Sequence, residues 1–300
     1  MAEDSSSDAP LSVAIDTGGT FTDVTLVDRQ TGRTIKAKVS STPEDPSVGF
    51  LQGILRALEL ANESASRISH VFHGTTVATN AILEGRGARS ALLTTAGFRH
   101  VLEIGRHDVP RVANMYHWVK PGRPIPARRI FEVRERLDTN GAVLEALNEL
   151  DVIEAAARIR KTGVEAVAVC LLHAYANAMH ERRVAQILEA ELPGVFISLS
   201  SEVLPSFREY ERSMATVLNA YVMPSISSYV ARLESRLAER GIRAPLLLMK
   251  SSGGVTGAST VRKQPIQTAL SGPAGGVVGA GMVAELSGHR EDRKSTRLNS

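Results

Sequence analysis

Hydrophobic residues in the first part of the chain are spaced as in three strands followed by a helix. Two apolar runs, at 11–15 and 24–27, flank a Gly/Thr-rich segment at 16–23, and a third alternating segment ends at Val39. From about Pro46 onward, apolar residues recur every three or four positions. Because apolar runs bounded by turn residues are typical of strands, the pattern predicts a strand hairpin, a third strand and a helix.

Strands and helices alternate through the rest of the chain, which predicts the α/β class. The expected strands lie at 71–72, 91–94, 165–172, 195–199 and 246–250. The expected helices lie at 77–83, 97–104, 148–162 and 178–191, then from Pro205, at 225–240 and from about Pro273. A hairpin-like segment at 129–147 turns at Asn140–Gly141, and residues 106–128 predict a long loop.

Composition narrows the class of protein. Of the 300 residues, 43% are hydrophobic, 22% charged and 4% aromatic, which excludes collagen, a disordered chain and a membrane bundle. The net charge of +3, from 35 basic and 32 acidic residues, is too small and too evenly spread for a nucleic-acid-binding surface. The single cysteine, Cys170, cannot form a disulfide framework, and the acidic start does not match a signal peptide. We therefore expect a cytoplasmic protein.

The sharpest chemical signal is the segment 16–23, Asp-Thr-Gly-Gly-Thr-Phe-Thr-Asp. Its two glycines allow a tight turn that brings backbone N–H groups to an anion, and its threonine hydroxyls can bind phosphate oxygens. Asp16, at the end of a buried strand, is placed to hold a hydrated Mg²⁺ that bridges phosphates. The alternative is a hairpin turn in which these side chains only satisfy backbone groups. The cofactor-binding candidates are Thr17, Gly18, Gly19, Thr20, Thr22 and Asp23, with Asp16 as the metal ligand and a catalytic candidate.

A second candidate begins where an apolar strand passes into a helix, at His-Gly-Thr-Thr-Val-Ala-Thr-Asn (73–80). Backbone N–H groups at the helix start, together with the hydroxyls of Thr75 and Thr76, would suit an anion. His73 is a catalytic candidate because a histidine can act as an acid or a base. The alternative is a helix N-cap beside a buried histidine. His70 and His73 point to opposite faces of a strand, so they do not share a metal site.

Four runs in this order resemble the hydantoinase A/5-oxoprolinase family, within the actin, Hsp70 and sugar-kinase ATPase superfamily. They are the segments at 16–23 and 73–80, Arg-Glu-Tyr-Glu-Arg with Val-Leu-Asn-Ala-Tyr-Val at 208–222, and Ser-Gly-Pro-Ala-Gly-Gly at 271–276. The resemblance covers residues 12–288. It implies an actin-like (ribonuclease H-like) N-terminal ATPase lobe, followed by a further α/β segment and helices.

The resemblance also implies a function. We expect a subunit of an ATP- and Mg²⁺-dependent hydrolase that opens cyclic amides such as hydantoin or 5-oxoproline by phosphorylating the amide oxygen. The expected partner is a hydantoinase B-type subunit or fused domain. We expect neither nucleic acid nor a membrane as a partner. An acetone or acetophenone carboxylase subunit is the alternative within the family. A non-metabolic actin/Hsp70-like ATPase is the alternative from another class.

The resemblance divides the chain into four regions. We expect a disordered N-terminus at 1–10, the N-terminal family region at 11–204, an incomplete main domain at 205–288 and an artefactual or disordered tail at 289–300. The family continues with a second phosphate loop, so we expect an N-terminal fragment without ATPase turnover of its own.

Two further segments allow alternative interpretations. The charged residues of 208–212 predict a solvated helix face, although a substrate or subunit contact stays open. Residues 279–284 match a loose dinucleotide-binding pattern, but no strand leads into them. Small residues there are better explained by close helix packing.

Overall fold

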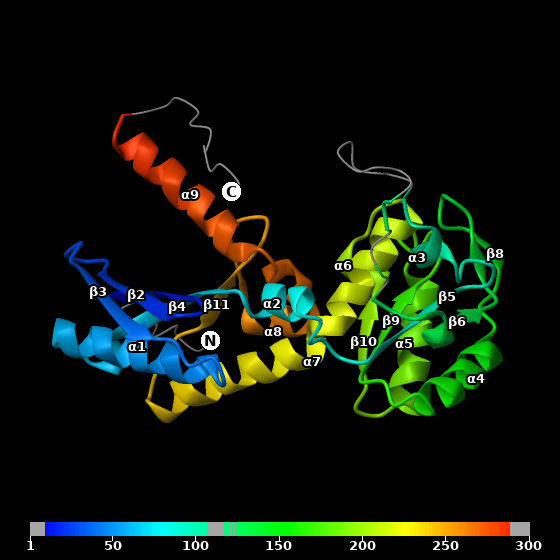
Figure 1. The fold of residues 1–300 in the computed structure, drawn as a ribbon, viewed down its shortest axis with the longest axis horizontal. Helices are drawn as coiled ribbons and strands as arrows, with labels where there is room; N and C mark the ends of the chain where they lie inside the picture. Colours follow the sequence, from blue (N-terminus) through cyan, green and yellow to red (C-terminus); the bar gives the residue numbers. More distant parts are fainter. Residues whose placement is uncertain (1–9, 107–116, 120–121, 123, 289–300) are drawn as a thin grey trace, which may run out of the picture. The chain divides into compact units, whose positions relative to one another are not determined.

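The computed structural model describes residues 10–106, 117–119, 122 and 124–288. Packing divides the chain into two compact units (Figure 1). Unit 1 contains the residues up to 76, 233–258 and those from 267 onward, and unit 2 contains 77–232 and 259–266. Residues 1–9 of the expected N-terminal segment 1–10, the expected tail at 289–300 and part of the expected loop at 106–128 lie outside the described residues, whereas Pro10 is described and buried. The expected region boundary after residue 204 follows the family's sequence regions and stays a prediction.

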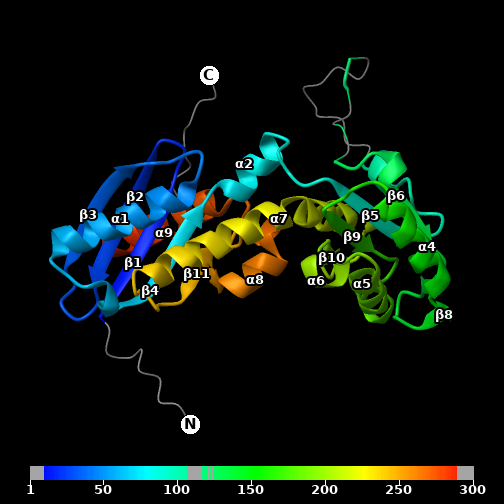
Figure 2. The ribbon, with the colours of Figure 1, turned by 90° about the horizontal axis from the view of Figure 1, so that it is seen from below.

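Unit 1 is built on a six-stranded sheet with the order β12-β11-β4-β1-β2-β3 (Figure 2). The strands are β1 (Leu11–Thr17), β2 (Phe21–Asp28), β3 (Thr34–Ser40), β4 (Ile68–Thr75), β11 (Leu246–Met249) and β12 (Val255–Gly257). β4 is parallel to both of its neighbours, β1 and β11, whereas the β1–β2, β2–β3 and β11–β12 pairs are antiparallel. The predicted strand hairpin and third strand are therefore confirmed.

Helix α1 (Pro46–Ala61) covers one face of this sheet. Its start is fixed by Asp45, whose side chain accepts a hydrogen bond from Ser47 N, and by Pro46 at the first helical turn. It ends at Asn62, which has the left-handed φ of 57°. The helix residues buried toward the sheet include Phe50, Ile54, Ala57 and Leu58.

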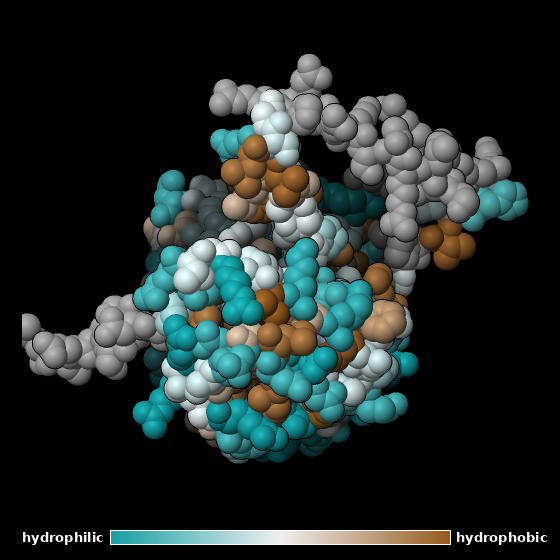
Figure 3. Space-filling view, turned by 90° about the vertical axis from the view of Figure 1, so that its left-hand side faces the viewer, coloured by the Kyte–Doolittle hydropathy of each residue, from teal (hydrophilic) through white to brown (hydrophobic). Residues whose placement is uncertain are grey.

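Helix α9 (Ser271–Leu286) lies on the other face, where it packs against β4 and β11 (Figure 1). Strand alternation separates the two faces: Val13 and Ile15 are buried toward α1, whereas Ala14 and Asp16 are exposed toward α9. Figure 3 shows a group of apolar side chains, coloured brown, projecting near the top of the face that it displays. The exposed apolar residues in the outer half of α9 are Met282, Val283 and Leu286.

Unit 2 contains a four-stranded, fully parallel sheet with the order β10-β9-β5-β6. The strands are β5 (Ser90–Thr95), β6 (Ile130–Val133), β9 (Ala166–Cys170) and β10 (Phe196–Leu199). Strands β5 and β9 are buried along their whole length, as expected of a parallel sheet with both faces covered. Helices α4 (Glu149–Arg160) and α5 (Met179–Glu191) share one core with the sheet, and α7 (Glu209–Glu239) contributes to a second.

The shorter elements complete the described chain. They are α2 (Val77–Leu83), α3 (Val101–Ile104), α6 (Ser200–Val203), α8 (Ala258–Lys263), β7 (Arg136–Leu137), β8 (Val143–Glu145) and 3₁₀ turns at Ala65–Arg67, Ala127–Arg129 and Pro265–Thr268. The chain is thus α/β, as predicted. Within the described residues, no helix is long and apolar enough to cross a membrane.

Two sequence-based element predictions were wrong. The helices expected on either side of residue 224 are one continuous helix, α7, with Pro224 inside it. Proline removes one backbone donor, and the buried Val217 and Ala220 before it and Ile226 and Tyr229 after it hold both halves in the core. The expected hairpin at 129–147 is also divided. Strand β6 joins the parallel sheet, and only β7 and β8 form a hairpin, around Gly141 with φ of 85°.

Candidate active site

The turn between β1 and β2 presents its tip and two carboxylates to solvent. Asp16 and Asp23 are directly paired across the hairpin, and Gly18 N donates to Phe21 O at 3.1 Å. Gly19 and Thr20 are exposed at the tip. Partial burial, and secondarily the charge of Asp23, raise the pKa of Asp16 above its ordinary value. The turn therefore concentrates negative charge where a cation would be attracted.

Hydroxyl groups on the α1 side of the sheet brace this turn. Thr22 is fully buried, and its Oγ1 lies 3.0 Å from Ser41 Oγ. Ser41 Oγ in turn donates to Gly18 O at 2.7 Å, and Ser41 N donates to Thr20 O at 2.9 Å. Thr17 is also buried on this side. The geometry does not favour the expected phosphate contacts by the Thr17 and Thr22 side chains, because both lie on the face opposite Asp16. The Thr22 hydroxyl is better placed to shape the turn, whereas Thr17 Oγ1 is buried without a hydrogen-bond partner among the described residues.

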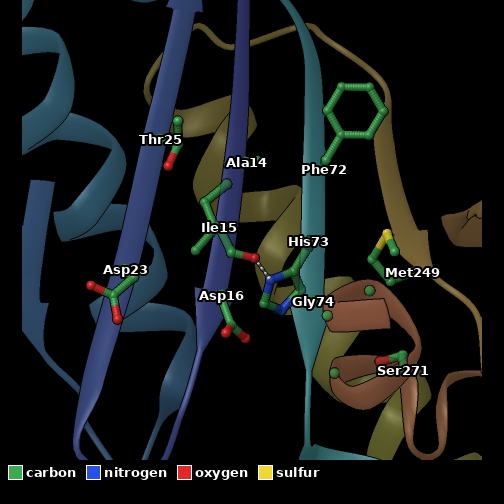
Figure 4. Close-up of a pocket in the computed structure, with 13 residues that line it drawn as sticks. Ala14, Ile15, Asp16, Asp23, Thr25, Phe72, His73, Gly74, Met249 and Ser271 are labelled. Carbon is green, nitrogen blue, oxygen red and sulfur yellow. Dashed lines mark hydrogen bonds between the residues drawn. The ribbon is translucent and has the colours of Figure 1, made fainter. Parts of the chain in front are cut away.

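A pocket of about 400 Å³ lies over the exposed side of the sheet, within unit 1 (Figure 4). Asp16, Asp23 and Gly74 lie toward one end, and Phe72 and Met249 add apolar surface. The complete lining is Ala14, Ile15, Asp16, Asp23, Thr25, Phe72, His73, Gly74, Met249, Ser271, Gly272, Gly275 and Gly276. Asp16 is thus exposed next to a cavity, as a ligand-binding residue requires.

The first turns of α9 form the second wall of the pocket. Ser271 Oγ donates to Thr75 O at 3.2 Å, which joins the helix start to the end of β4. A Cβ atom added at Gly272 or Gly276 would meet no atom within 4 Å, whereas one at Gly275 would lie 3.3 Å from Met249 Cε. The absence of side chains at these positions leaves room between α9 and the strands.

His73 does not offer a titratable group to this pocket. Its ring is fully buried, lies edge-on to the Phe50 ring of α1 at 4.9 Å, and its Nδ1 donates to Ile15 O at 3.3 Å. Burial lowers the pKa of His73 to about 4, so the imidazole is neutral near pH 7. This geometry does not favour the expected acid–base role and instead supports a part in holding β4 against β1.

Thr75 is the last residue of β4, and Thr76 follows the strand. Thr75 is buried and its carbonyl accepts the hydrogen bond from Ser271, while Thr76 is half-buried and ends the first segment of unit 1. An anion contact by their hydroxyls stays a prediction.

The donor set at the pocket fits a Mg²⁺ ion that is bound mainly through a phosphate ligand. Among the described residues, no group of three or more His, Cys, Asp or Glu side chains could hold a metal ion. Mg²⁺ commonly binds one or two carboxylates and takes its remaining ligands from water and substrate phosphates. Asp16 and Asp23 provide such carboxylates, although Asp23 also pairs with Lys38 at 3.0 Å.

Sequence reasoning missed a second group of buried polar residues, in unit 2. Arg212, expected on a solvated helix face, is only 1% exposed. The spacing of the helix could have indicated this burial. Thr216 and Ala220 follow Arg212 at intervals of four residues, so the three residues share one helix face, and both are fully buried. Glu135, His180 and Glu181 are buried as well.

The fold of this chain matches that of a solved carboxylase. The nucleotide-free structure of acetone carboxylase matches this fold with a TM-score of 0.84 and 25% identity, covering 93% of this chain and 41% of that one. The sequence matches the hydantoinase/oxoprolinase N-terminal region over residues 12–192 and hydantoinase/oxoprolinase over residues 212–291. The chain belongs to the hydantoinase/oxoprolinase family.

Two curated relatives show the range of this family. The acetophenone carboxylase gamma subunit of Aromatoleum aromaticum is 33% identical, over 97% of this chain and 41% of its own length. The caprolactamase subunit alpha of Pseudomonas jessenii is 32% identical, over 87% of this chain and 38% of its own length. The chain therefore spans about two fifths of the length of these relatives.

Proposed function

We propose that the pocket beside Asp16 is the phosphate end of a Mg-ATP site in an enzyme that activates a carbonyl oxygen by phosphorylation. The observation that carries the proposal is the exposed Asp16 carboxylate beside a glycine turn, facing a cavity in a chain of this family. The exposed backbone of Gly19 and Thr20 would bind phosphate oxygens, while Gly18, whose N–H donates to Phe21 O, would hold the shape of the turn. Asp16 would hold Mg²⁺, which would neutralise charge on the transferring phosphoryl group.

We assign the reaction to cyclic amides, of the hydantoin, 5-oxoproline or lactam type. The γ-phosphoryl group would pass to the amide oxygen, and ADP would leave. Water would then add to the carbon, and the C–N bond would break as the nitrogen takes a proton. A second water would release phosphate from the resulting acyl phosphate. The caprolactamase relative supports this assignment, and its name as a subunit supports a separate partner subunit, which we assign to the hydantoinase B type.

The acetophenone carboxylase relative favours one alternative, phosphorylation of a ketone enolate before carboxylation. Both reactions would use the same phosphate turn, so the described residues of the pocket do not separate them. A cytoplasmic location stays a prediction.

The test is substrate-stimulated ADP release by the full-length protein with its partner subunit. Hydantoin, 5-oxoproline and caprolactam are compared with acetone and acetophenone in the presence of bicarbonate. An amide labelled with ¹⁸O at its carbonyl should transfer label to the released phosphate if that oxygen is phosphorylated. ADP release with a ketone and bicarbonate alone would favour the carboxylase. No stimulation by any of these compounds would overturn the proposal.

A further inference from the structure

The carboxyl ends of the unit 2 strands meet at a topological switch point. The chain passes from β5 to β6 on one side and later returns to β9 on the other side of β5. In open α/β sheets, the crevice outside the strand ends at such a point is where ligands bind. Thr95 ends β5 here and Cys170 ends β9.

A buried guanidinium group lies at this point. Arg212 donates through Nη2 to Leu171 O, directly after β9, and its Cζ lies 5.5 Å from the centre of the Tyr175 ring. Its Nε and Nη1 atoms are buried and have no hydrogen-bond partner among the described residues. Buried polar atoms are nearly always bonded, so two such atoms on one cation call for an explanation.

The neighbouring carboxylates do not neutralise this cation. Glu181 Oε1 accepts hydrogen bonds from Leu171 N and Ser200 Oγ, and its Oε2 accepts one from Ser201 N. Neither of its oxygens lies within ion-pair distance of Arg212. An uncompensated buried charge is strongly unfavourable, so a protein that retains one usually has a counter-ion for it.

The second buried carboxylate is also engaged. Glu135 Oε1 accepts a hydrogen bond from Thr95 Oγ1, and its Oε2 lies 2.8 Å from His180 Nδ1. The switch point therefore contains two carboxyl groups that already accept hydrogen bonds, and one guanidinium whose Nε and Nη1 have no acceptor among the described residues. A small anion could satisfy those donors. Burial raises the pKa of Glu181, so this interior disfavours negative charge, and an anion with one charge is favoured over an anion with two.

We propose that Arg212 is the anchor of a second ligand site, separate from the pocket of unit 1, that takes a small oxyanion with a single negative charge, either a carboxylate or bicarbonate. The Nε and Nη1 donors bind the anion oxygens, and the Tyr175 ring limits access to one side of the guanidinium. This inference does not depend on the proposed ATP chemistry.

The test is a thermal-unfolding titration of the 300-residue chain at constant ionic strength and pH 8. Acetate and bicarbonate are titrated against chloride, with phosphate as the doubly charged comparison. We expect Tm to rise by roughly 3 °C and to saturate with acetate or bicarbonate, because a ligand that binds only the folded state stabilises it. A saturable rise with phosphate alone, or no saturable rise, overturns the proposal.

Two variants assign the effect to one side chain. R212M keeps the apolar stem but removes the donors and should lose the saturable rise. R208M removes one positive charge at an exposed position, four residues before Arg212, and should keep the saturable rise in Tm. If R212M does not fold, R212K retains the charge without Nε, and its apparent anion affinity should fall at least tenfold. An unchanged response in whichever Arg212 variant folds would show that the anion binds elsewhere.

Discussion

Asp16 and His73 lie on paired strands but on opposite faces of the same sheet. In the parallel β1–β4 register, Asp16 is opposite Gly74 and Ile15 is opposite His73. This offset of one residue leaves the carboxylate exposed at the pocket and places the imidazole against Phe50. The two side chains therefore cannot act together on one ligand. Asp16 remains the catalytic candidate of the pair.

Replacing Asp16 with Asn should abolish ATP-dependent turnover in the full-length protein while leaving its Tm nearly unchanged. Asn keeps the shape and one acceptor oxygen, so the hairpin turn should form. It loses the negative charge that would attract Mg²⁺. We would measure ADP release as a function of Mg²⁺ concentration. Turnover near the wild-type rate, with the same Mg²⁺ requirement, would remove Asp16 from the site.

Asp138→Asn is the matched control for this variant. Asp138 is also a turn aspartate, and its Oδ1 accepts hydrogen bonds from Asn140 N and Ala142 N in the β7–β8 hairpin. Asn is a good substitute in such turns, so this variant should keep both its Tm and its activity.

The neutral state of His73 should make folding stability depend on pH. Its pKa of about 4 in the folded state lies below the unfolded value of 6.5, so the unfolded chain binds more protons between these values. The stabilisation is fully present above pH 6.5 and is lost as the pH falls toward 4. Over this range, wild type should lose about 3 kcal/mol more than His73→Gln. Urea unfolding at several pH values measures the difference. Parallel pH profiles for the two proteins would contradict the assignment.

Close packing between α1 and β2 should make Gly53→Ala destabilising. A Cβ at Gly53 would lie 2.5 Å from Val24 Cγ2, and the β-branched valine has little freedom to move away. The steric cost should exceed the gain in helix propensity and lower the free energy of unfolding by about 1–2 kcal/mol. Gly49→Ala is the control, because its Cβ would meet atoms only at 3.4 Å and the change should be neutral or stabilising. Equal effects in chemical denaturation would argue against the close approach of Gly53 to Val24 as the cause.

Leucine at Gly276 should stabilise the protein and impair ligand binding at the same time. A Cβ there meets no atom within 4 Å, and leucine is favoured over glycine inside a helix by about 1 kcal/mol. Because Gly276 lines the pocket, the new side chain should raise the KM for ATP or for the carbonyl substrate at least several-fold. Gly279→Leu, on the same helix but outside the pocket lining, should stabilise without changing either KM. The pocket assignment fails if the two variants have the same kinetics.

The sequence was sufficient to predict the strands around Asp16 because their burial alternates with a period of two. It could not show which threonines face the pocket. Thr17 and Thr22 lie among the buried residues of their strands, Thr20 is exposed at the tip of the turn, and Thr25 is the threonine that lines the pocket. That distinction depends on where each strand ends, which is the least certain part of a pattern-based prediction.

Arg212 marks another limit of sequence reasoning. A charged residue near a helix start is usually solvated, and only the fold places this one beside Leu171 O and Tyr175. The sequence also could not show that α7 continues through Pro224. Proline tends to break a helix, but the packing of buried residues on both sides of Pro224 outweighs this tendency.

The order of strands along the chain has a consequence for synthesis on the ribosome. All four strands of the unit 2 sheet have left the ribosome soon after Leu199 is synthesised. In unit 1, β4 cannot pair on its second edge until β11, which begins at Leu246, has been synthesised. At roughly 5–20 residues per second, synthesis from the end of β4 to the start of β11 takes roughly 9–34 s, and over that time β4 is an unpaired sheet edge while the inserted unit begins to fold. An open edge of this kind is a template for pairing with another chain. Nascent chains stalled between these two points should therefore be the most prone to aggregate.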